Sequence, residues 1–258
     1  WDIMQLINQP ASIMLTMALT MKLGLAPLHF WLPEVLQGSP LKTALIITTW
    51  QKLAPMTLLF LTNNSMHPPM LMLMGLLSTL LGGWGGLNQT QTRKIMAFSS
   101  IAHLGWMVTV LTLSPKILVL NLIIYMLMTT AMFLTLMLSS SKTIKDLTTV
   151  WTISPTLAPL MMLLLMSMGG LPPLSGFMPK WLILQELTSH TLLMIATILV
   201  LSALLSLFFY MRMSYVTTLT TPPTTLQTKM KWRFKPKYTT TTLIALALSL
   251  FLLPITPT

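Results

Sequence analysis

Long apolar stretches recur along this chain, separated by short polar connections. An α-helix needs about 20 apolar residues to cross the ~30 Å hydrocarbon core of a bilayer. Eight stretches approach or exceed that length, and they cover 11–32, 41–62, 68–87, 95–113, 117–139, 153–187, 192–211 and 239–257. Charged residues make up only 7% of the sequence, whereas a soluble domain carries about 25%. The sequence therefore predicts an all-α, polytopic transmembrane helix bundle with about eight spans, forming a single domain over 1–258.

The basic residues gather in alternate connections. Short connections make neighbouring spans antiparallel, so the odd-numbered connections share one side of the membrane. These hold Lys42, Arg93, Lys94, Lys142, Lys145, Arg212, Lys229, Lys231, Arg233, Lys235 and Lys237. The even-numbered connections hold only Lys116. This asymmetry accounts for the net charge of +11 without nucleic acid, and it indicates that the odd connections are cytoplasmic or in the matrix.

The C-terminal part has its own pattern. The longest odd connection, 212–238, is polar and basic. We expect it to lie along the membrane surface or to pack on partner subunits. A C-terminal helix is expected over 239–258.

Two stretches 146 residues apart share a sequence pattern. Residues 24–34 read GLAPLHFWLPE and residues 170–180 read GLPPLSGFMPK, with five identical positions. Proline lacks an N–H and clashes with the preceding helical turn, so both stretches must interrupt their segments. A pair of interrupted helices in two inverted halves indicates a transport path. The alternative is coincidence in a sequence rich in leucine and proline.

One lysine lies near the middle of a predicted span. Lys52 is eleven residues past Leu41, which places it ~16 Å into the membrane at 1.5 Å per residue. A lysine at the centre of a span costs roughly 2.5–3.5 kcal/mol on insertion scales. Such a cost indicates a polar cavity and a function there. The alternative is a structural pair with a carboxylate, but the chain has only four acids and none is on that helix.

Two further lysines flank the interruptions. Lys22 comes just before the first, and Lys180 follows the second. Burial disfavours the ammonium form of a lysine and a nearby acid favours it. A lysine held between those influences can gain and release a proton near neutral pH, whereas arginine stays protonated.

Histidine and the acids supply possible partners. His103 could relay protons between the lysines, because its charge changes close to physiological pH; the alternative is a hydrogen-bonded core residue. Glu34 and Glu186 lie near segment ends and could be counter-ions or ordinary interfacial acids. His29, beside the first interruption, is the weaker candidate for a role in transfer.

Other chemistry is excluded by what the sequence lacks. The chain has no cysteine, so it carries no disulfide, no cysteine-ligated iron–sulfur cluster and no c-type haem. Its four histidines are widely spaced, and no metal site is expected. The glycine-rich run 82–86 ends a membrane segment and follows no strand, so it predicts close helix packing and not a dinucleotide loop.

Several motifs resemble those of a known family. Residues 22–34, KLGLAPLHFWLPE, are similar to the broken-helix motif of the antiporter-like, proton-pumping membrane subunits of NADH:ubiquinone oxidoreductase, respiratory complex I. Further motifs of the same family are WQKLAP at 50–55, GGLNQTQ at 85–91, RKIMAFSSIAHLGW at 93–106 and GGLPPLSGFMPKW at 169–181. The resemblance covers essentially the whole chain and is least distinctive after about Thr217.

The resemblance implies two inverted five-helix halves, two discontinuous helices and a central hydrophilic axis. Protons would move along that axis, driven by quinone chemistry elsewhere. By motif, Lys22, Lys52 and Lys180 match the family's buried proton-carrying lysines, and His103 matches its axis histidine. The family pairs its first lysine with a glutamate on an earlier helix. No such helix is present here and the chain begins at Trp1, so we expect upstream sequence to be missing.

The resemblance also implies the setting. No cofactor is expected in this chain, since FMN, the iron–sulfur clusters and ubiquinone bind other subunits. The expected partners are other membrane-arm subunits and membrane lipids, without nucleic acid and without direct NADH contact. The expected location is the mitochondrial inner membrane, with the basic loops in the matrix. A self-contained cation/proton antiporter and a structural membrane scaffold are the alternative functions.

Overall fold

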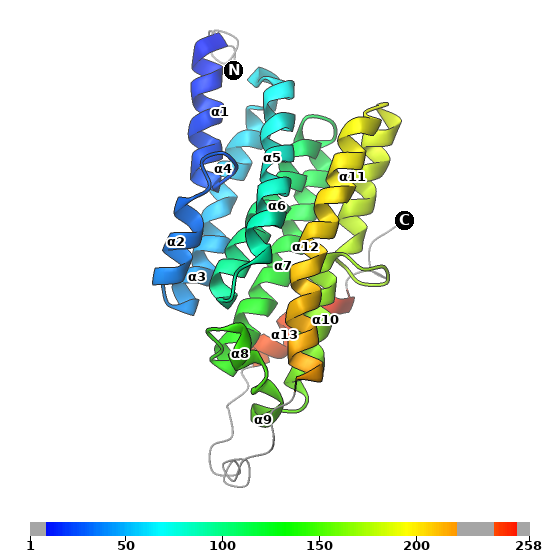
Figure 1. Ribbon diagram of the computed structural model, residues 1–258. Helices are drawn as coiled ribbons and strands as arrows, with labels where there is room; N and C mark the ends of the chain where they lie inside the picture. The colour runs from blue at the N-terminus through cyan, green and yellow to red at the C-terminus, as the bar shows by residue number, and fades with distance from the viewer. Residues whose placement is uncertain (1–8, 221–239, 252–258) are drawn as a thin grey trace.

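A computed structural model describes residues 9–220 and 240–251, and in these ranges the chain is a bundle of helices (Figure 1). The α-helices are α1 (Gln9–Leu23), α2 (Trp31–Gly38), α3 (Leu41–Thr48), α4 (Trp50–Leu61), α5 (Pro68–Leu87), α6 (Thr92–Leu111), α7 (Pro115–Ser139), α8 (Ile144–Leu147), α9 (Val150–Ile153), α10 (Leu157–Gly169), α11 (Phe177–Ser189), α12 (Leu193–Leu219) and α13 (Thr240–Phe251). A 3-10 turn, η2 (Asn63–Ser65), follows α4. The β structure in these ranges is one isolated bridge between Gln91 and Thr143.

Seven of the predicted segments run along the bundle. Five helical stretches are long and apolar enough to cross a membrane: α3 with α4, α5, α6, α7 and α12. The other two are the interrupted segments, in which the shorter apolar helices α1 and α10 are each followed by a second helix, α2 or α11. The first segment was predicted to end at 32, but α2 continues it to Gly38. The predicted all-α membrane bundle is confirmed.

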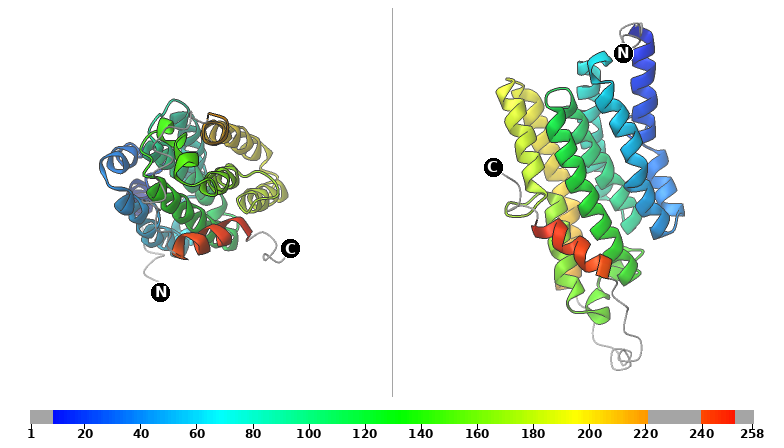
Figure 2. Two further views of the ribbon diagram at one scale, coloured as in Figure 1. Left: turned by 90° about the horizontal axis from the view of Figure 1, so that it is seen from below. Right: turned by 180° about the vertical axis from the view of Figure 1, so that it is seen from behind.

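The C-terminal region differs from the expectation. The basic connection was predicted to begin at 212, whereas α12 continues through Leu219. Most of the connection, 221–239, lies outside the described residues. In the views from below and behind, α13 runs across the outside of the bundle and not along it (Figure 2). It packs on α7 and α10. The described part of the eighth predicted segment therefore does not run parallel to the seven segments of the bundle.

Helix α6 forms the centre of the bundle. In its most apolar window 89% of the residues are buried, against 33–50% in the other four spans. Glycines let α5 approach it closely: a Cβ on Gly82 would lie 2.7 Å from the backbone nitrogen of Ala102 on α6. Further along the run, a Cβ on Gly86 would strike the ring of Phe209 on α12. The predicted packing role of the glycine-rich run is therefore confirmed.

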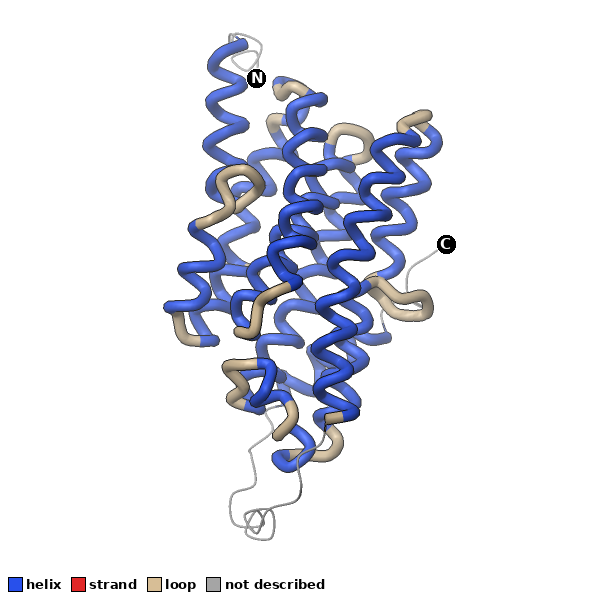
Figure 3. The backbone as a smooth tube through the Cα atoms, in the orientation of Figure 1, coloured by secondary structure: helices blue, strands red, loops and turns tan. Residues whose placement is uncertain are grey.

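The connections between the long helices lie at the two ends of the bundle, and the loops of the two interruptions lie partway along it (Figure 3). At the end that holds most of the described basic residues, two arginines bind the carbonyls that terminate helices. Arg93 Nη1 donates to the carbonyl of Ser39 at 2.5 Å, just beyond α2. Arg212 Nη2 donates to the carbonyl of Gln89 at 2.6 Å, just beyond α5. A cation at a helix C-terminus satisfies free carbonyls and complements the helix dipole, so these residues also fix the helix ends.

A capping box closes the short helix α8 at the same end. Asp146 Oδ2 accepts from the backbone N–H of Thr143 at 2.8 Å and of Lys142 at 2.9 Å. Partial burial alone would raise the pKa of Asp146, but these backbone donors, Thr143 Oγ1 and the nearby Lys142 charge outweigh it and hold the pKa below its usual value.

Replacing this carboxylate is expected to open α8. Asp146→Ala removes the side chain that accepts both N–H groups, and loss of a cap costs about 1 kcal/mol. The pKa of Asp146 is lower in the folded state than in the unfolded state. Its carboxylate therefore stabilises the fold fully above the unfolded-state pKa, and this stabilisation is lost as the pH falls toward the folded-state pKa. Hydrogen exchange of residues 142–149 at neutral pH measures the effect, with exposed Lys145→Ala as control. Equal protection in both variants would refute this role.

Candidate functional site

The two interruptions share one backbone geometry. Gly24 and Gly170 have φ of 80° and 79°, a left-handed conformation that residues with a Cβ rarely adopt. The N–H of Leu25 donates to the carbonyl of Thr20 at 3.0 Å, and the N–H of Leu171 donates to that of Met166 at 3.3 Å. These bonds form the same C-terminal cap on α1 and α10. The next helices begin at positions 31 and 177, again 146 residues apart, so the predicted internal repeat is confirmed.

The two interrupted segments run in opposite directions along the bundle. In Figure 1, α1 lies above α2, whereas α10 lies below α11. The carbonyls that the interruptions free are satisfied differently. In the first repeat Trp31 Nε1 donates to the carbonyl of Met21 at 2.9 Å. In the second, Lys180 Nζ donates to the carbonyl of Gly169 at 2.8 Å. The second interruption therefore holds a charged amine, and the first an indole.

Lys52 is buried against a hydroxyl. Its side chain is 4% exposed, and Nζ donates to Tyr125 Oη at 3.1 Å. Tyr125 Oη in turn donates to the carbonyl of Thr48 at 3.2 Å. That carbonyl is available because α3 ends there, and the N–H of Lys52 bonds to the carbonyl of Thr49 instead. The short interval between α3 and α4 thus provides the anchor that orients Tyr125 toward Lys52.

His103 continues the same line of polar groups. It is 6% exposed, and its ring centroid lies 5.6 Å from that of Tyr125. On its other side is a cavity of about 10 Å³ lined by Ala102, His103, Trp106, Lys180, Ser206 and Tyr210. This is about the room that one water molecule needs.

Tyr210 supplies a polar atom beside that cavity. Its Oη lies near Ser99, but it is buried without a hydrogen bond of ordinary geometry. Buried hydroxyls normally have a partner in the protein or in ordered water. The cavity, His103 and Lys180 are therefore suited to hold a water against Tyr210.

Four helices contribute to this row. Lys52 comes from α4, Tyr125 from α7, His103 from α6 and Lys180 from α11. A row of hydroxyl, imidazole and amine groups with space for water can pass protons from one group to the next. Of the candidate site residues, the structure brings together Lys52, His103 and Lys180.

The remaining candidates lie outside the row. Lys22 is exposed in the last turn of α1, and Glu34 is exposed on α2. Glu186 lies 4.0 Å from His190 near the end of α11. That contact is the one ion pair among the ranges 9–220 and 240–251. His29 is buried in the loop of the first interruption and does not line the cavity beside His103.

The sequence analysis did not single out Tyr125, which belongs to the row, or Tyr210, which lies beside its cavity. Tyr125 and Tyr210 stand alone among apolar residues of α7 and α12, where each looks like a packing residue. The available signal was the phenolic hydroxyl, which needs a partner when its ring is buried in a membrane helix.

Among the described residues, no three His, Cys, Asp or Glu side chains gather in a way that could hold a metal ion.

Comparison with known proteins places this geometry in a family. Residues 3–206 match the family described as NADH:quinone oxidoreductase/Mrp antiporter, TM, and residues 207–258 match the NADH dehydrogenase subunit 2 C-terminus. Over its full length the chain is 56% identical to NADH-ubiquinone oxidoreductase chain 2 of Xenopus laevis and 58% identical to that of Varanus timorensis. The chain belongs to the NADH-ubiquinone oxidoreductase chain 2 family. It spans 75% of the length of each of these two relatives.

Solved structures agree with membership of the chain 2 family. A chain of respiratory complex I from Thermus thermophilus superposes with a TM-score of 0.77 at 26% identity, covering 96% of this chain and 60% of that one. A chain of the Mrp complex from Dietzia superposes with a TM-score of 0.75 at 18% identity, covering 86% of this chain and 46% of that one, which shows a shared fold. The antiporter-like fold that the family resemblance implied is therefore confirmed for this chain.

Proposed function

We propose that this member of the chain 2 family carries protons along the row of Lys52, Tyr125, His103 and Lys180. Electron transfer from NADH to ubiquinone in other subunits would drive the transfer. The observation that supports this most is the Lys52 amine, 4% exposed and paired with a hydroxyl instead of a carboxylate. A membrane interior makes an ammonium ion costly, and a neutral partner leaves that cost partly uncompensated. Lys52 is therefore suited to release and regain its proton.

The contacts suggest how each group takes part. Tyr125 Oη donates to the carbonyl of Thr48, so its lone pairs are turned toward the Lys52 amine. His103 can accept a proton at one ring nitrogen and donate one from the other. A water in the cavity beside Tyr210 would bridge His103 to Lys180. Because like charges at neighbouring groups disfavour each other, a proton arriving on one member favours release from the next.

The cofactors, partners and location proposed for this chain follow from its resemblance to relatives named NADH-ubiquinone oxidoreductase chain 2. FMN, iron–sulfur clusters and ubiquinone would reside in other membrane-arm and peripheral subunits, and this chain would make no direct NADH contact. Membrane lipids would surround the apolar helices. The location would be the mitochondrial inner membrane, with the end that carries Arg93, Lys94, Lys142 and Lys145 in the matrix.

A self-contained cation/proton antiporter is the second candidate, because the Mrp complex shares the fold. Transport assays separate the two. We expect liposomes holding this chain alone to show no sodium-dependent proton flux, and liposomes holding the assembled oxidoreductase to acidify when NADH and ubiquinone are supplied. Sodium-driven proton flux through the isolated chain would favour the antiporter and refute the proposed function.

Removing the tyrosine hydroxyl tests the positioning of Lys52. Tyr125→Phe deletes the acceptor of the Lys52 amine, and a hydrogen bond to a charged group contributes about 1.5–3 kcal/mol. We expect NADH-driven proton pumping to fall roughly tenfold, with a changed pH profile and normal assembly. The control is Tyr215→Phe, since the Tyr215 ring is 58% exposed on α12. An unchanged pumping rate and pH profile in Tyr125→Phe would show that the contact is only structural.

A further inference from the structure

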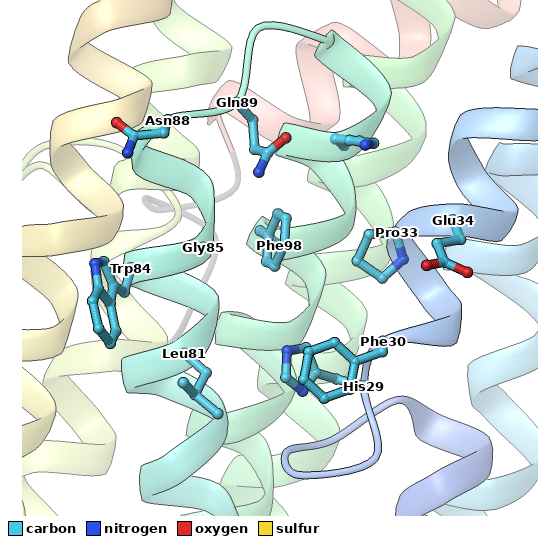
Figure 4. A pocket seen from close by; sticks show the side chains of 11 residues that line it. His29, Phe30, Pro33, Glu34, Leu81, Trp84, Gly85, Asn88, Gln89 and Phe98 are labelled. Carbon is cyan, nitrogen blue, oxygen red and sulfur yellow. The ribbon is translucent and has the colours of Figure 1, made fainter.

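A groove of about 490 Å³ opens on the outside of the bundle, between α2 and the α5–α6 hairpin, and plays no part in the proton row (Figure 4). Its volume falls in the range of about 300–1,000 Å³ typical of small-molecule sites. The side chains in Figure 4 divide it into two ends: Asn88 and Gln89 lie at one, and His29 and Phe30 at the other.

Two charges of opposite sign line the groove. Lys94 is partly buried near the start of α6, and Glu34 is exposed on α2. These two charges form no salt bridge with each other. The amides of Asn88 and Gln89 lie at the end of α5, and Glu34 lies across the groove from Asn88, at the level of Phe98 (Figure 4). The groove therefore offers separate partners for an anion and for a cation of one ligand.

The apolar end follows α5 into the membrane. Leu81 lies seven residues before Asn88, about 10 Å along the helix axis. Between them, Trp84 is 69% exposed, and Phe30 across the groove is 72% exposed. Since α5 is a candidate membrane span, the groove leads from the helix ends toward the hydrocarbon. This apolar part of the groove would stabilise an acyl chain but not a free ion.

His29 closes the deeper end of the groove with a ring that is almost fully buried. The residue is 5% exposed, lines the groove, and Nδ1 has no hydrogen bond. The carbonyl of Pro27 faces the ring, but without the geometry of a hydrogen bond. Because Nδ1 itself has almost no exposed surface, the ring contributes packing at this end of the groove and no hydrogen bond to a ligand in it.

We infer that the groove binds a phospholipid whose headgroup carries both a phosphate and a primary ammonium, as in phosphatidylethanolamine. Lys94 and the Asn88 and Gln89 amides bind the phosphate, and Glu34 accepts from the ammonium. Farther down, the acyl chain packs on Leu81 and Trp84. A quaternary ammonium has no N–H for Glu34, and a purely anionic headgroup would be repelled by Glu34, so neither class fits as well.

Native mass spectrometry of the purified complex, exchanged into mixed phosphatidylethanolamine, phosphatidylcholine and cardiolipin, tests the site. We expect one selectively retained phosphatidylethanolamine. Glu34→Gln and Lys94→Gln should each weaken its retention about tenfold, the scale of one charge-assisted hydrogen bond. Lys94→Arg should keep it, as should Lys145→Gln at an exposed position outside the groove. Equal retention in all variants, or preferential retention of another lipid class, would overturn the inference.

A second variant blocks the groove without changing its charge. A Cβ on Gly85 would lie 2.3 Å from Cε1 of Phe98, so Gly85→Ala drives that ring into the groove. We expect the bound phospholipid to be lost from assembled complex, as judged by native gel electrophoresis of the same sample. If the lipid stays in the assembled Gly85→Ala complex, or if a protein segment of a neighbouring subunit fills the groove in an experimental structure, the assignment is wrong.

Discussion

Lys52→Met is expected to abolish NADH-driven proton pumping while the complex still assembles. Methionine has a similar length and no charge, so it fills the site beside Tyr125 and removes the cost of a buried ammonium. It cannot carry a proton, and positioned proton-transfer groups contribute about 10²–10⁴-fold to rates. Acidification of proteoliposomes should therefore fall by about 10²-fold or more. The measurement is a pH-sensitive dye inside liposomes that contain the purified complex.

Two companion variants sharpen this result. Lys42→Met removes an exposed lysine at the start of the same helical stretch and should leave pumping unchanged. Lys52→Arg keeps the positive charge but cannot release its proton, so pumping should be lost as in Lys52→Met. If the chain were only a structural scaffold, Lys52→Met would leave proton pumping intact whenever the complex assembles. Full pumping in the assembled Lys52→Met complex would therefore exclude the proposed proton row.

Gly170→Ala is expected to destabilise the second interruption and to reduce proton pumping. A residue with a Cβ at φ of 79° costs roughly 1–2 kcal/mol. The added Cβ would also lie 2.9 Å from both Cδ and Nζ of Lys180. It must displace the amine from the carbonyl of Gly169, a charge-assisted bond whose loss costs about 1.5–3 kcal/mol. We expect a lower melting temperature of the purified complex together with reduced pumping.

The repeat provides matched controls for this prediction. At Gly169 a Cβ would meet its nearest neighbour at 3.7 Å and the backbone is helical, so Gly169→Ala should be tolerated. At Gly24 the φ is 80° but the nearest atoms belong to Leu32 at 3.5 Å, so Gly24→Ala should show the backbone cost alone. If Gly170→Ala is no worse than Gly24→Ala, then Lys180 does not depend on this position.

Features set by local chemistry could be predicted from the sequence. The Pro and Gly of the two related stretches made the interruptions predictable, because neither residue allows a helix to continue unchanged. The position of Lys52 inside a long helical stretch followed from the length of its apolar segment. These inferences depend on one residue or on a short window, and the structure agrees with them.

Features set by packing could not be predicted in the same way. The contact between Lys52 and Tyr125 joins residues 73 positions apart, and Tyr125 has no local pattern that distinguishes it from a packing residue. The exposure of Lys22 depends on which face of α1 meets the bundle, and α1 has almost no amphipathic pattern to indicate a face. The course of α13 across α7 depends on the neighbouring helices, since its apolar sequence would equally suit a crossing helix.

Proton transfer along this row requires water to connect its amines inside the membrane. Electron cryo-microscopy of the assembled complex, at a resolution that shows ordered water, tests it most directly. The expected result is a water in the cavity of about 10 Å³, about 3 Å from Tyr210 Oη and hydrogen-bonded toward His103 and Lys180. A dry cavity, with apolar side chains closed between His103 and Lys180, would contradict proton transfer along this row.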